Sequence, residues 1–175
     1  FRYVDPPPQA PPGGTYLHAA PMFHLANGAA MYSVLLSGGS NVIIQGFTPD
    51  GVATAIQRDR VTDVLLVPTM IQMFVDHPKL AEYDLSSLTG IAYGASVISD
   101  AVLSRAMKAL PNVQFTQAYG MTELSPVATF LHWKEHIGEG RAKGRHRGAG
   151  RATLGCEVKI VDADDKVVPT GTVGE

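Results

Sequence analysis

Charged residues are scarce in this 175-residue chain, at 17% of the sequence, whereas hydrophobic residues make up 45%. An average globular domain is about 25% charged. So few charges suit a chain that is mostly interior, or one whose surface is partly covered by another part of a protein. The formal net charge of −2 gives no general reason to expect a nucleic acid or an acidic membrane as a partner.

Cysteine and long apolar runs are scarce as well. Cys156 is the only cysteine, so no disulfide can form within the chain, which fits a reducing compartment. No apolar run approaches the ~18 residues of a membrane-spanning helix. The sequence also has no basic segment followed by an apolar run, the pattern of a signal peptide. We therefore expect a cytoplasmic protein, with peripheral membrane association as the alternative. The first residue is Phe1, and we expect a piece of a longer protein.

Three segments are predicted. Residues 1–14 contain two proline clusters and are expected to be an extended lead-in. Residues 15–131 are expected to form an α/β subdomain. Residues 132–175 are expected to be a basic, solvated, glycine-rich loop followed by part of a small β subdomain, in which a strand over Glu157–Asp162 turns into Val167 and Val168.

Apolar runs alternate with segments of helical spacing through the second segment. This alternation predicts the α/β class, with a parallel sheet flanked by helices on both faces. The expected strands are Thr15–Ala20, Asn41–Gln45, Asp63–Val67, Gly90–Tyr93 and Val113–Ala118. The expected helices are His24–Leu36, a helix opened by Thr48-Pro49-Asp50, Thr69–Val75, and a helix capped by Ser99-Asp100.

The stretch Gln117–Glu123 begins at the end of the last of these strands. In an open parallel sheet, ligands bind in the crevice beyond the carboxyl ends of the strands. A ring, a glycine, a hydroxyl and a carboxylate within five residues suit a nucleotide. The alternative is a strand followed by a turn and a Thr-capped helix with Glu in its first turn. Two further strand ends favour the nucleotide site. The one at Tyr93–Ser96 ends in small residues, which would let a flat base lie between two backbones. The one at Pro21–His24 would face the same crevice.

Seven short motifs, in order, resemble the adenylate-forming enzymes of the acyl-CoA synthetase type, a superfamily that also includes luciferases and peptide-synthetase adenylation domains. They cover nearly all of the chain after residue 14. The motifs are Ala20–His24, Val67–Thr69, Tyr93–Ser96, Tyr119–Glu123, Gly148–Arg151, Gly155–Asp162 and Gly171–Glu175.

The resemblance implies an ATP-dependent acid–CoA ligase, which joins a carboxylate to AMP and then passes the acyl group to coenzyme A. It implies that Tyr119 stacks on the adenine, that Thr122 hydrogen-bonds the α-phosphate, and that Glu123 holds Mg²⁺, a hard cation that prefers oxygen ligands. The nucleotide-binding residues so implied are Gly94, Ala95, Ser96, Gln117, Ala118, Tyr119, Gly120, Met121 and Thr122.

The resemblance also places His24 beside the reacting carboxyl group, although a lone His is more often a packed residue. Enzymes of this superfamily that activate amino acids have an Asp there, and burying an unpaired ammonium is costly. We therefore expect a fatty or other apolar acid. The implied acid-binding residues are His24, Leu25, Met70, Gly94, Met121 and Val127, of which the methionines are also ordinary core residues in many proteins.

The expected partners are a small carboxylic acid, ATP and CoA, and no nucleic acid, because the basic loop Lys134–Arg151 lacks interleaved aromatic residues. The phosphate-binding loop, the ribose-binding Asp and the C-terminal lysine of such enzymes are not in this sequence, so we expect these 175 residues alone to be inactive. Alternatives left open are an aryl-acid or luciferase-like adenylating enzyme and a non-catalytic AMP-binding fragment. A homo-oligomer of the full-length protein is also left open.

Overall fold

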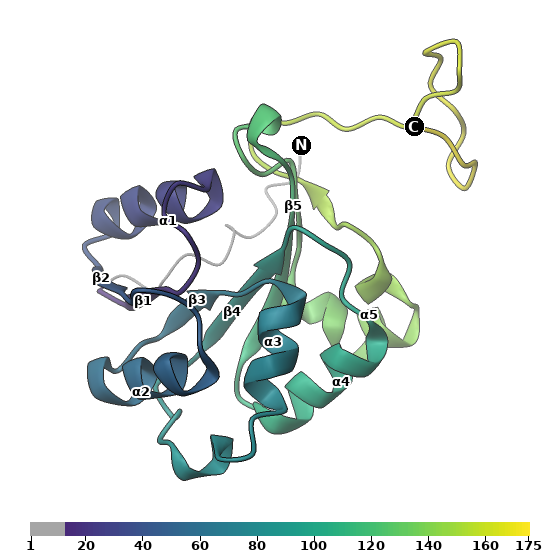
Figure 1. Cartoon of the computed structure of the whole chain (residues 1–175). Coiled ribbons are helices and arrows are strands. Elements are labelled where there is room, and N and C mark those ends of the chain that lie inside the picture. Colours follow the sequence, from purple (N-terminus) through teal and green to yellow (C-terminus); the bar gives the residue numbers. More distant parts are fainter. Residues whose placement is uncertain (1–12) are drawn as a thin grey trace.

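The computed structural model describes residues 13–175, so the predicted lead-in lies almost entirely outside the described residues. Its framework is one seven-stranded sheet in the order β2-β1-β3-β4-β5-β6-β7 (Figure 1). The first five strands are parallel, and the last two are antiparallel to their neighbours. The strands are β1 (Thr15–His18), β2 (Ser40–Ile43), β3 (Asp63–Leu65), β4 (Gly90–Gly94), β5 (Gln114–Tyr119), β6 (Thr129–Leu131) and β7 (Arg151–Ala152).

Helices cover both faces of the sheet, which confirms the α/β prediction, whereas β6 and β7 were not predicted. Among the described residues, no helix has the length and apolar character needed to cross a membrane. The α-helices are α1 (Leu25–Leu36), α2 (Pro49–Asp59), α3 (Pro68–Val75), α4 (Asp100–Ala109) and α5 (Gly138–Ala142). The short 3-10 helices are η1 (Leu80–Glu82), η2 (Thr122–Leu124), η3 (Trp133–His136) and η4 (Arg145–Arg147).

The helix-start signals in the sequence act as expected. Thr48 caps α2, with its hydroxyl accepting a hydrogen bond from the Gly51 amide at 3.0 Å. Ser99 caps α4 and accepts from the Val102 amide at 3.3 Å. Each cap satisfies an amide that has no partner within its own helix, which is worth about 1 kcal/mol.

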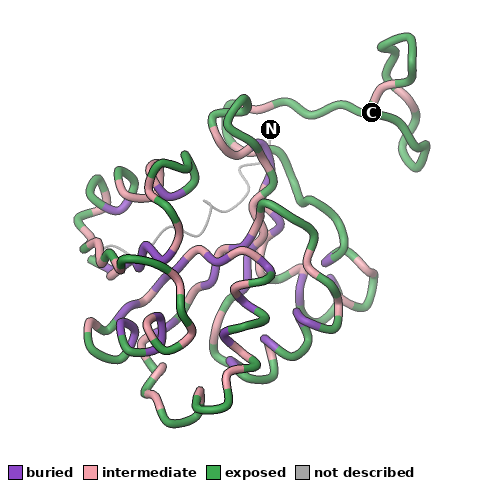
Figure 2. Tube along the Cα trace, viewed as in Figure 1, coloured by how far each residue is buried: buried purple, intermediate pink, exposed green. Residues whose placement is uncertain are grey.

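The main core lies between the sheet and the layer formed by α2, α3 and α4 (Figure 2). Leu17, Val64 and Ile91 point from three adjacent strands into this layer and are almost fully buried. The other face carries α1, where Tyr16 and Val34 form a smaller cluster. The outer face of α1 is exposed, with Leu36 90% accessible. Because successive side chains alternate across a strand, the two clusters occupy opposite faces of the sheet.

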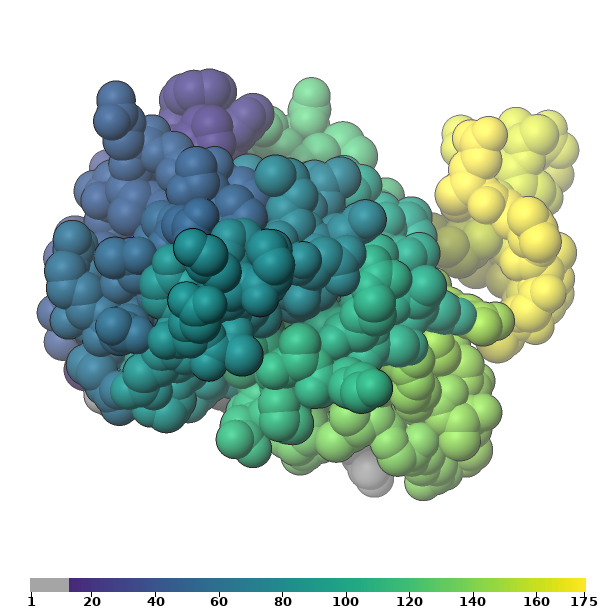
Figure 3. Space-filling view, turned by 60° about the horizontal axis from the view of Figure 1, so that its bottom comes forward, coloured from purple at the N-terminus to yellow at the C-terminus, as the bar shows by residue number. Residues whose placement is uncertain are grey.

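The predicted hairpin in the last segment is present only in part. Val161 and Val167 form one antiparallel bridge, and the Asp162 amide donates to the Lys166 carbonyl across the predicted turn. No strand forms over Glu157–Asp162, so that part of the prediction is wrong. After β7 the chain extends away from the sheet, and the final residues stand apart at one side of the molecule (Figure 3).

The residues 132–151, hereafter the 132–151 segment, are not an irregular loop, although most of their charged side chains are exposed to solvent as predicted. They form η3, α5 and η4, and both His136 and His146 are more than 90% buried. The basic residues Arg141 and Arg147 hydrogen-bond to α4. The local composition concealed this packing because the partners lie more than 30 residues away in the sequence.

Candidate functional site

A cavity of about 600 Å³ lies between α1 and the carboxyl ends of the parallel strands. The chain places β2 on one side of β1 and then β3 on the other side, so the strand order changes direction between β1 and β3. Helices α1 and α2, which make these two connections, cover opposite faces of the sheet. Ligands of open α/β sheets bind at such switch points. Ala20, just beyond β1, and Val67, just beyond β3, both line the cavity.

The structure brings most of the predicted site residues to this one cavity, although they come from separate parts of the chain. Four predicted residues lie outside its lining: Ser96, Gln117, Tyr119 and Glu123. The predicted residues that line it are His24, Leu25, Met70, Gly94, Ala95, Ala118, Gly120, Met121, Thr122 and Val127.

The alternation of side chains along β5 accounts for this division. Ala118 and Gly120 line the cavity, so Gln117 and Tyr119 point to the opposite face of the sheet. Tyr119 is the last residue of the strand and is 48% accessible. The end of β5 therefore separates the cavity on one side from an exposed aromatic ring on the other.

Two glycines at the site are required by the protein backbone itself. A Cβ atom on Gly94 would lie 2.3 Å from the Ala118 carbonyl oxygen, and one on Gly120 would lie 2.0 Å from the Pro126 carbonyl oxygen. From the sequence, Gly94 was expected to make room for a base lying between two backbones. The structure gives a different reason, since neighbouring backbone occupies the space that a side chain would need.

Ala95 has a backbone conformation that the sequence did not reveal. Its φ is 65°, in the left-handed region that residues with a Cβ seldom adopt. Such conformations cost of order 1–3 kcal/mol, persist where the surroundings impose them, and cluster at functional sites. The strained residue follows directly after β4 and lines the cavity.

Two polar residues of the cavity, Tyr16 and Asn27, were not predicted from the sequence. Tyr16 lines its floor, and burial, with a smaller effect of the Asp63 charge, raises the pKa of the Tyr16 hydroxyl well above its usual range. The Asn27 side-chain amide donates to the Ala20 carbonyl at 2.6 Å and so ties α1 to the loop after β1. Both residues sit in segments that look like ordinary core in the sequence. The rest of the lining is predominantly apolar, as small-molecule sites usually are.

Glu123 is exposed in η2, next to Thr122 at the cavity. Within residues 13–175, no group of three or more His, Cys, Asp or Glu side chains could hold a metal ion. Mg²⁺ commonly keeps several waters and is held by one or two carboxylates together with substrate phosphates. A single accessible carboxylate therefore fits a magnesium ion that arrives with a nucleotide, and does not fit an ion held by the protein alone.

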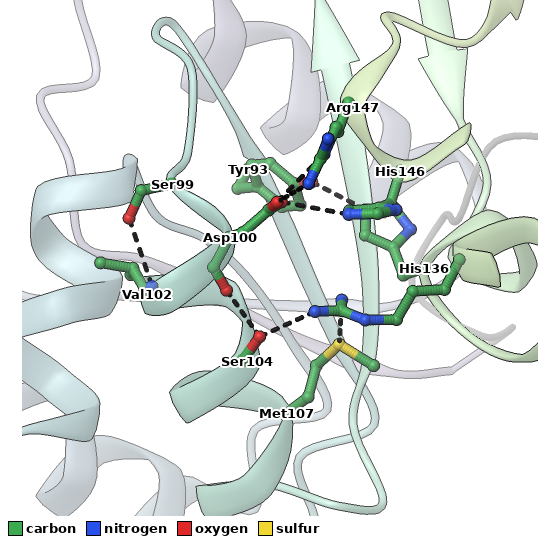
Figure 4. A network of polar contacts seen from close by, with 10 residues as sticks. Tyr93, Ser99, Asp100, Val102, Ser104, Met107, His136, His146 and Arg147 are labelled. Carbon is green, nitrogen blue, oxygen red and sulfur yellow. Dashed lines mark hydrogen bonds and ion pairs between the residues drawn. The ribbon is translucent and has the colours of Figure 1, made fainter. Parts of the chain in front are cut away.

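The 132–151 segment packs against the end of β4 and against α4 (Figure 4). His136 lies 2.7 Å from the Tyr93 hydroxyl through Nε2 and 3.2 Å from the His132 carbonyl through Nδ1. A carbonyl only accepts, so Nδ1 carries the proton and the Tyr93 hydroxyl donates to Nε2. Burial is the main cause that lowers the pKa of His136 to about 4, so the imidazole is neutral at pH 7.

The same segment contacts the first residue of α4. Arg147 donates to one Asp100 carboxylate oxygen at 2.6 and 3.0 Å, and His146 Nε2 donates to the other at 3.1 Å (Figure 4). The hydrogen bonds from Arg147 are the main cause that lowers the pKa of the Asp100 carboxyl. The Arg141 guanidinium donates to the Ser104 hydroxyl at 2.7 Å, one turn further along α4.

A cavity beyond the strand ends, at a topological switch point, is the arrangement in which open α/β sheets bind ligands. The family model of the AMP-binding enzymes matches residues 3–175, and the chain belongs to this family. The match confirms the resemblance seen in the sequence, including the type of fold.

Individual relatives narrow the class. The chain is 34% identical over 166 residues to the medium/long-chain-fatty-acid–CoA ligase FadD8 of Mycobacterium tuberculosis, covering 94% of this chain and 28% of that protein. It is 34% identical over 163 residues to a feruloyl-CoA synthase of an Amycolatopsis species, covering 91% of this chain and 31% of that protein. The chain thus spans less than a third of the length of these relatives.

The chain is also similar to a solved structure. The amide bond synthetase McbA of Marinactinospora thermotolerans superposes with a TM-score of 0.82 at 29% identity, over 95% of this chain and 32% of that one. The relatives with CoA-ligase names support an acid–CoA ligase at the level of the family.

Proposed function

We propose that the protein containing this chain is an ATP-dependent acid–CoA ligase. The observation that carries the proposal is the meeting, at one cavity, of the Pro21–His24, Gly94-Ala95 and Gly120–Thr122 motifs. The family membership and the names of the relatives support the same conclusion. The substrates would be a carboxylic acid, ATP and coenzyme A.

The division at the end of β5 suggests how two substrates are accommodated. The acid would enter the cavity, and the adenine would lie beyond the strand ends, against Tyr119 and the backbone of Gly94–Ser96. Thr122, which lines the cavity at the start of η2, would donate its hydroxyl to the α-phosphate. Gly94 and Gly120 permit the close backbone packing on which this arrangement depends.

The first step would form a bond between a carboxylate oxygen of the acid and the α-phosphorus of ATP, while the bond from phosphorus to the pyrophosphate oxygen breaks. No covalent intermediate with the protein is needed, so the side chains act by positioning and by stabilising charge. His24, at the cavity next to α1, would orient the reacting carboxylate. A Mg²⁺ ion, held by Glu123 and the phosphates, would neutralise charge on the departing pyrophosphate. In the second step the thiol of CoA would displace AMP.

The cavity lining supports an apolar acid. Leu25, Met70, Met121 and Val127 contribute apolar surface, and no Asp or Glu of the described chain lines the cavity to pair with a substrate ammonium. A fatty acid is the first candidate. An aryl acid is the second, because one relative is a feruloyl-CoA synthase. An amine in place of CoA in the second step is a further candidate, since McbA is an amide bond synthetase.

Acid-dependent exchange of labelled pyrophosphate into ATP by the full-length protein tests the proposal. Exchange with fatty or aryl acids, and thioester formation on adding CoA, is the expected result. No exchange with any acid, together with measurable AMP binding, would favour a non-catalytic AMP-binding protein. The 175-residue chain assayed alone should be inactive, because the phosphate-loop and lysine motifs of the family are not in its sequence.

Substituting Glu123 with Ala in the full-length protein tests the metal role. We expect acyl-adenylate formation to fall about 100-fold or more, since a metal ion can contribute several kcal/mol of charge stabilisation. Mg²⁺-dependent tightening of ATP binding, measured calorimetrically, should weaken too. Glu82→Ala is the matched control, since Glu82 is likewise exposed in a short 3-10 helix, and it should behave as wild type. Normal adenylation by Glu123→Ala would remove Glu123 from the proposed site.

A further inference from the structure

One loop of the candidate site is held at both of its ends by the same distant stretch of chain. Residues 94–99, hereafter the 94–99 loop, run from the last residue of β4 to the residue that caps α4, and they include Gly94 and Ala95 of the cavity lining. Tyr93 precedes it and hydrogen-bonds to His136. Asp100 follows it and is bound by His146 and Arg147. All three of these partners belong to the 132–151 segment (Figure 4).

The same stretch is also attached to the end of β5. Strand β6 immediately precedes the 132–151 segment and pairs antiparallel with β5 over Gln117–Tyr119. At its other end, Arg151 pairs with Phe130 of β6. A Cβ on Gly150 would lie 2.0 Å from the Phe130 carbonyl oxygen, so the two backbones are in close contact there. Both strand ends of the proposed nucleotide site are therefore fastened to one continuous piece of chain.

We propose that the 132–151 segment is a clamp that sets the conformation of the 94–99 loop, with His136 and His146 as positioning residues for nucleotide binding. This inference rests on the proposed function. Neither histidine lines the cavity, so each acts through the residue it holds. The strained Ala95 explains why a clamp is needed, because a left-handed residue persists only where its surroundings impose that conformation.

The contact between His136 and Tyr93 offers a sharp test. In the full-length protein, His136→Phe keeps a ring of similar shape and removes the acceptor, which leaves the Tyr93 hydroxyl buried without a partner. We expect the KM for ATP to rise about tenfold, while kcat at saturating ATP and the KM for the acid stay within about twofold. A loss of folded protein would lower kcat and leave both KM values unchanged, so this pattern distinguishes positioning from stability.

Rescue and control variants complete the test. Adding Tyr93→Phe to His136→Phe removes the unpaired hydroxyl, and the KM for ATP should return to within about threefold of wild type, as expected for coupled neighbours. Tyr93→Phe alone is a milder variant for use if His136→Phe fails to fold, and it should raise the KM for ATP about threefold. Lys143→Ala is the control, because Lys143 is exposed on the outer side of the same segment and bonds only to Glu139 among the described residues.

An unchanged KM for ATP in both His136→Phe and Tyr93→Phe would overturn the clamp. If the wild-type protein shows no acid-dependent exchange of pyrophosphate into ATP, the proposed function has failed. Amide hydrogen exchange then tests separately whether the 132–151 segment holds the 94–99 loop. Peptides that cover residues 94–99 should then exchange faster in His136→Phe, while peptides from α2 keep wild-type protection. Equal protection of residues 94–99 in both proteins would overturn the clamp on its own.

Discussion

At the scale of single residues, Gly120 shows how tightly the site is built. The backbone of Pro126 and Val127 occupies the space where a side chain on Gly120 would begin. The sequence motif predicted that Gly120 belongs to the site. Only the structure shows why a glycine is needed there, because the residues that crowd it fold back after η2. Ala95 gives the opposite case, since nothing in its residue type announces a left-handed backbone.

Gly120→Ala should therefore destabilise the fold. A Cβ would lie 2.0 Å from the Pro126 carbonyl oxygen and 2.7 Å from the Val127 Cα, so the backbone must move. We expect the free energy of unfolding to fall by about 1–3 kcal/mol, the usual effect of overpacking. Urea denaturation measures it. Gly46→Ala is the control, since a Cβ there meets nothing within 4 Å, and equal stability of the two variants would contradict the prediction.

At the scale of elements, the predictable parts were those with local signals. The strands β1 to β5 follow apolar runs, and Thr48 and Ser99 mark the starts of α2 and α4. Strand β6 is only three residues long, and no local pattern distinguishes it from a loop. The helices of the 132–151 segment are stabilised by contacts with Tyr93 and α4, which are distant in sequence.

The buried His136 makes the stability of the protein depend on pH. Its pKa is about 4 in the folded protein and near 6.5 when exposed. Between these values the unfolded chain binds more protons, so the free energy of unfolding should fall as the pH drops from about 6.5 towards 4, by up to about 3 kcal/mol from this residue. The pKa of the Asp100 carboxyl is lowered, mainly by its hydrogen bonds from Arg147, so the stability that this group contributes is lost only at more acidic pH.

Urea unfolding at pH 7 and pH 5 measures this dependence. His136→Phe should show a clearly smaller difference between the two pH values than the wild-type protein, because the variant has lost the group that takes up the proton. Equal differences in the two proteins would show that another group is responsible for the acid sensitivity.

At the scale of the whole molecule, the cavity runs along most of α1. Its lining includes His24 at the start of the helix and Ser37 just after its end. A helix of this length extends about 18 Å. A long apolar space between a helix and a sheet is suited to an extended alkyl chain, and the position of Ala30 about halfway along α1 offers a way to test that.

Ala30→Trp in the full-length protein should shorten the cavity. Activity with long-chain acids should fall about tenfold or more relative to short acids, because the indole occupies space that the end of a long chain needs. Measuring kcat/KM across acids of increasing length, with aryl acids included, gives the result. Leu36→Trp on the exposed face of α1 is the control and should leave the preference unchanged. A uniform loss for all acids in Ala30→Trp would argue against a tunnel under α1.

The exposed side of α1 lies next to β2, which among the described residues pairs with β1 only. Tyr32, Leu35 and Leu36 are each more than half accessible there, and so is Ile43 at the end of β2. Open strand edges and apolar patches are the surfaces through which proteins most readily self-associate. Preparations of the 175-residue chain by itself are therefore exposed to aggregation through this side, and a charged substitution at Leu36 is the gentlest way to counter it.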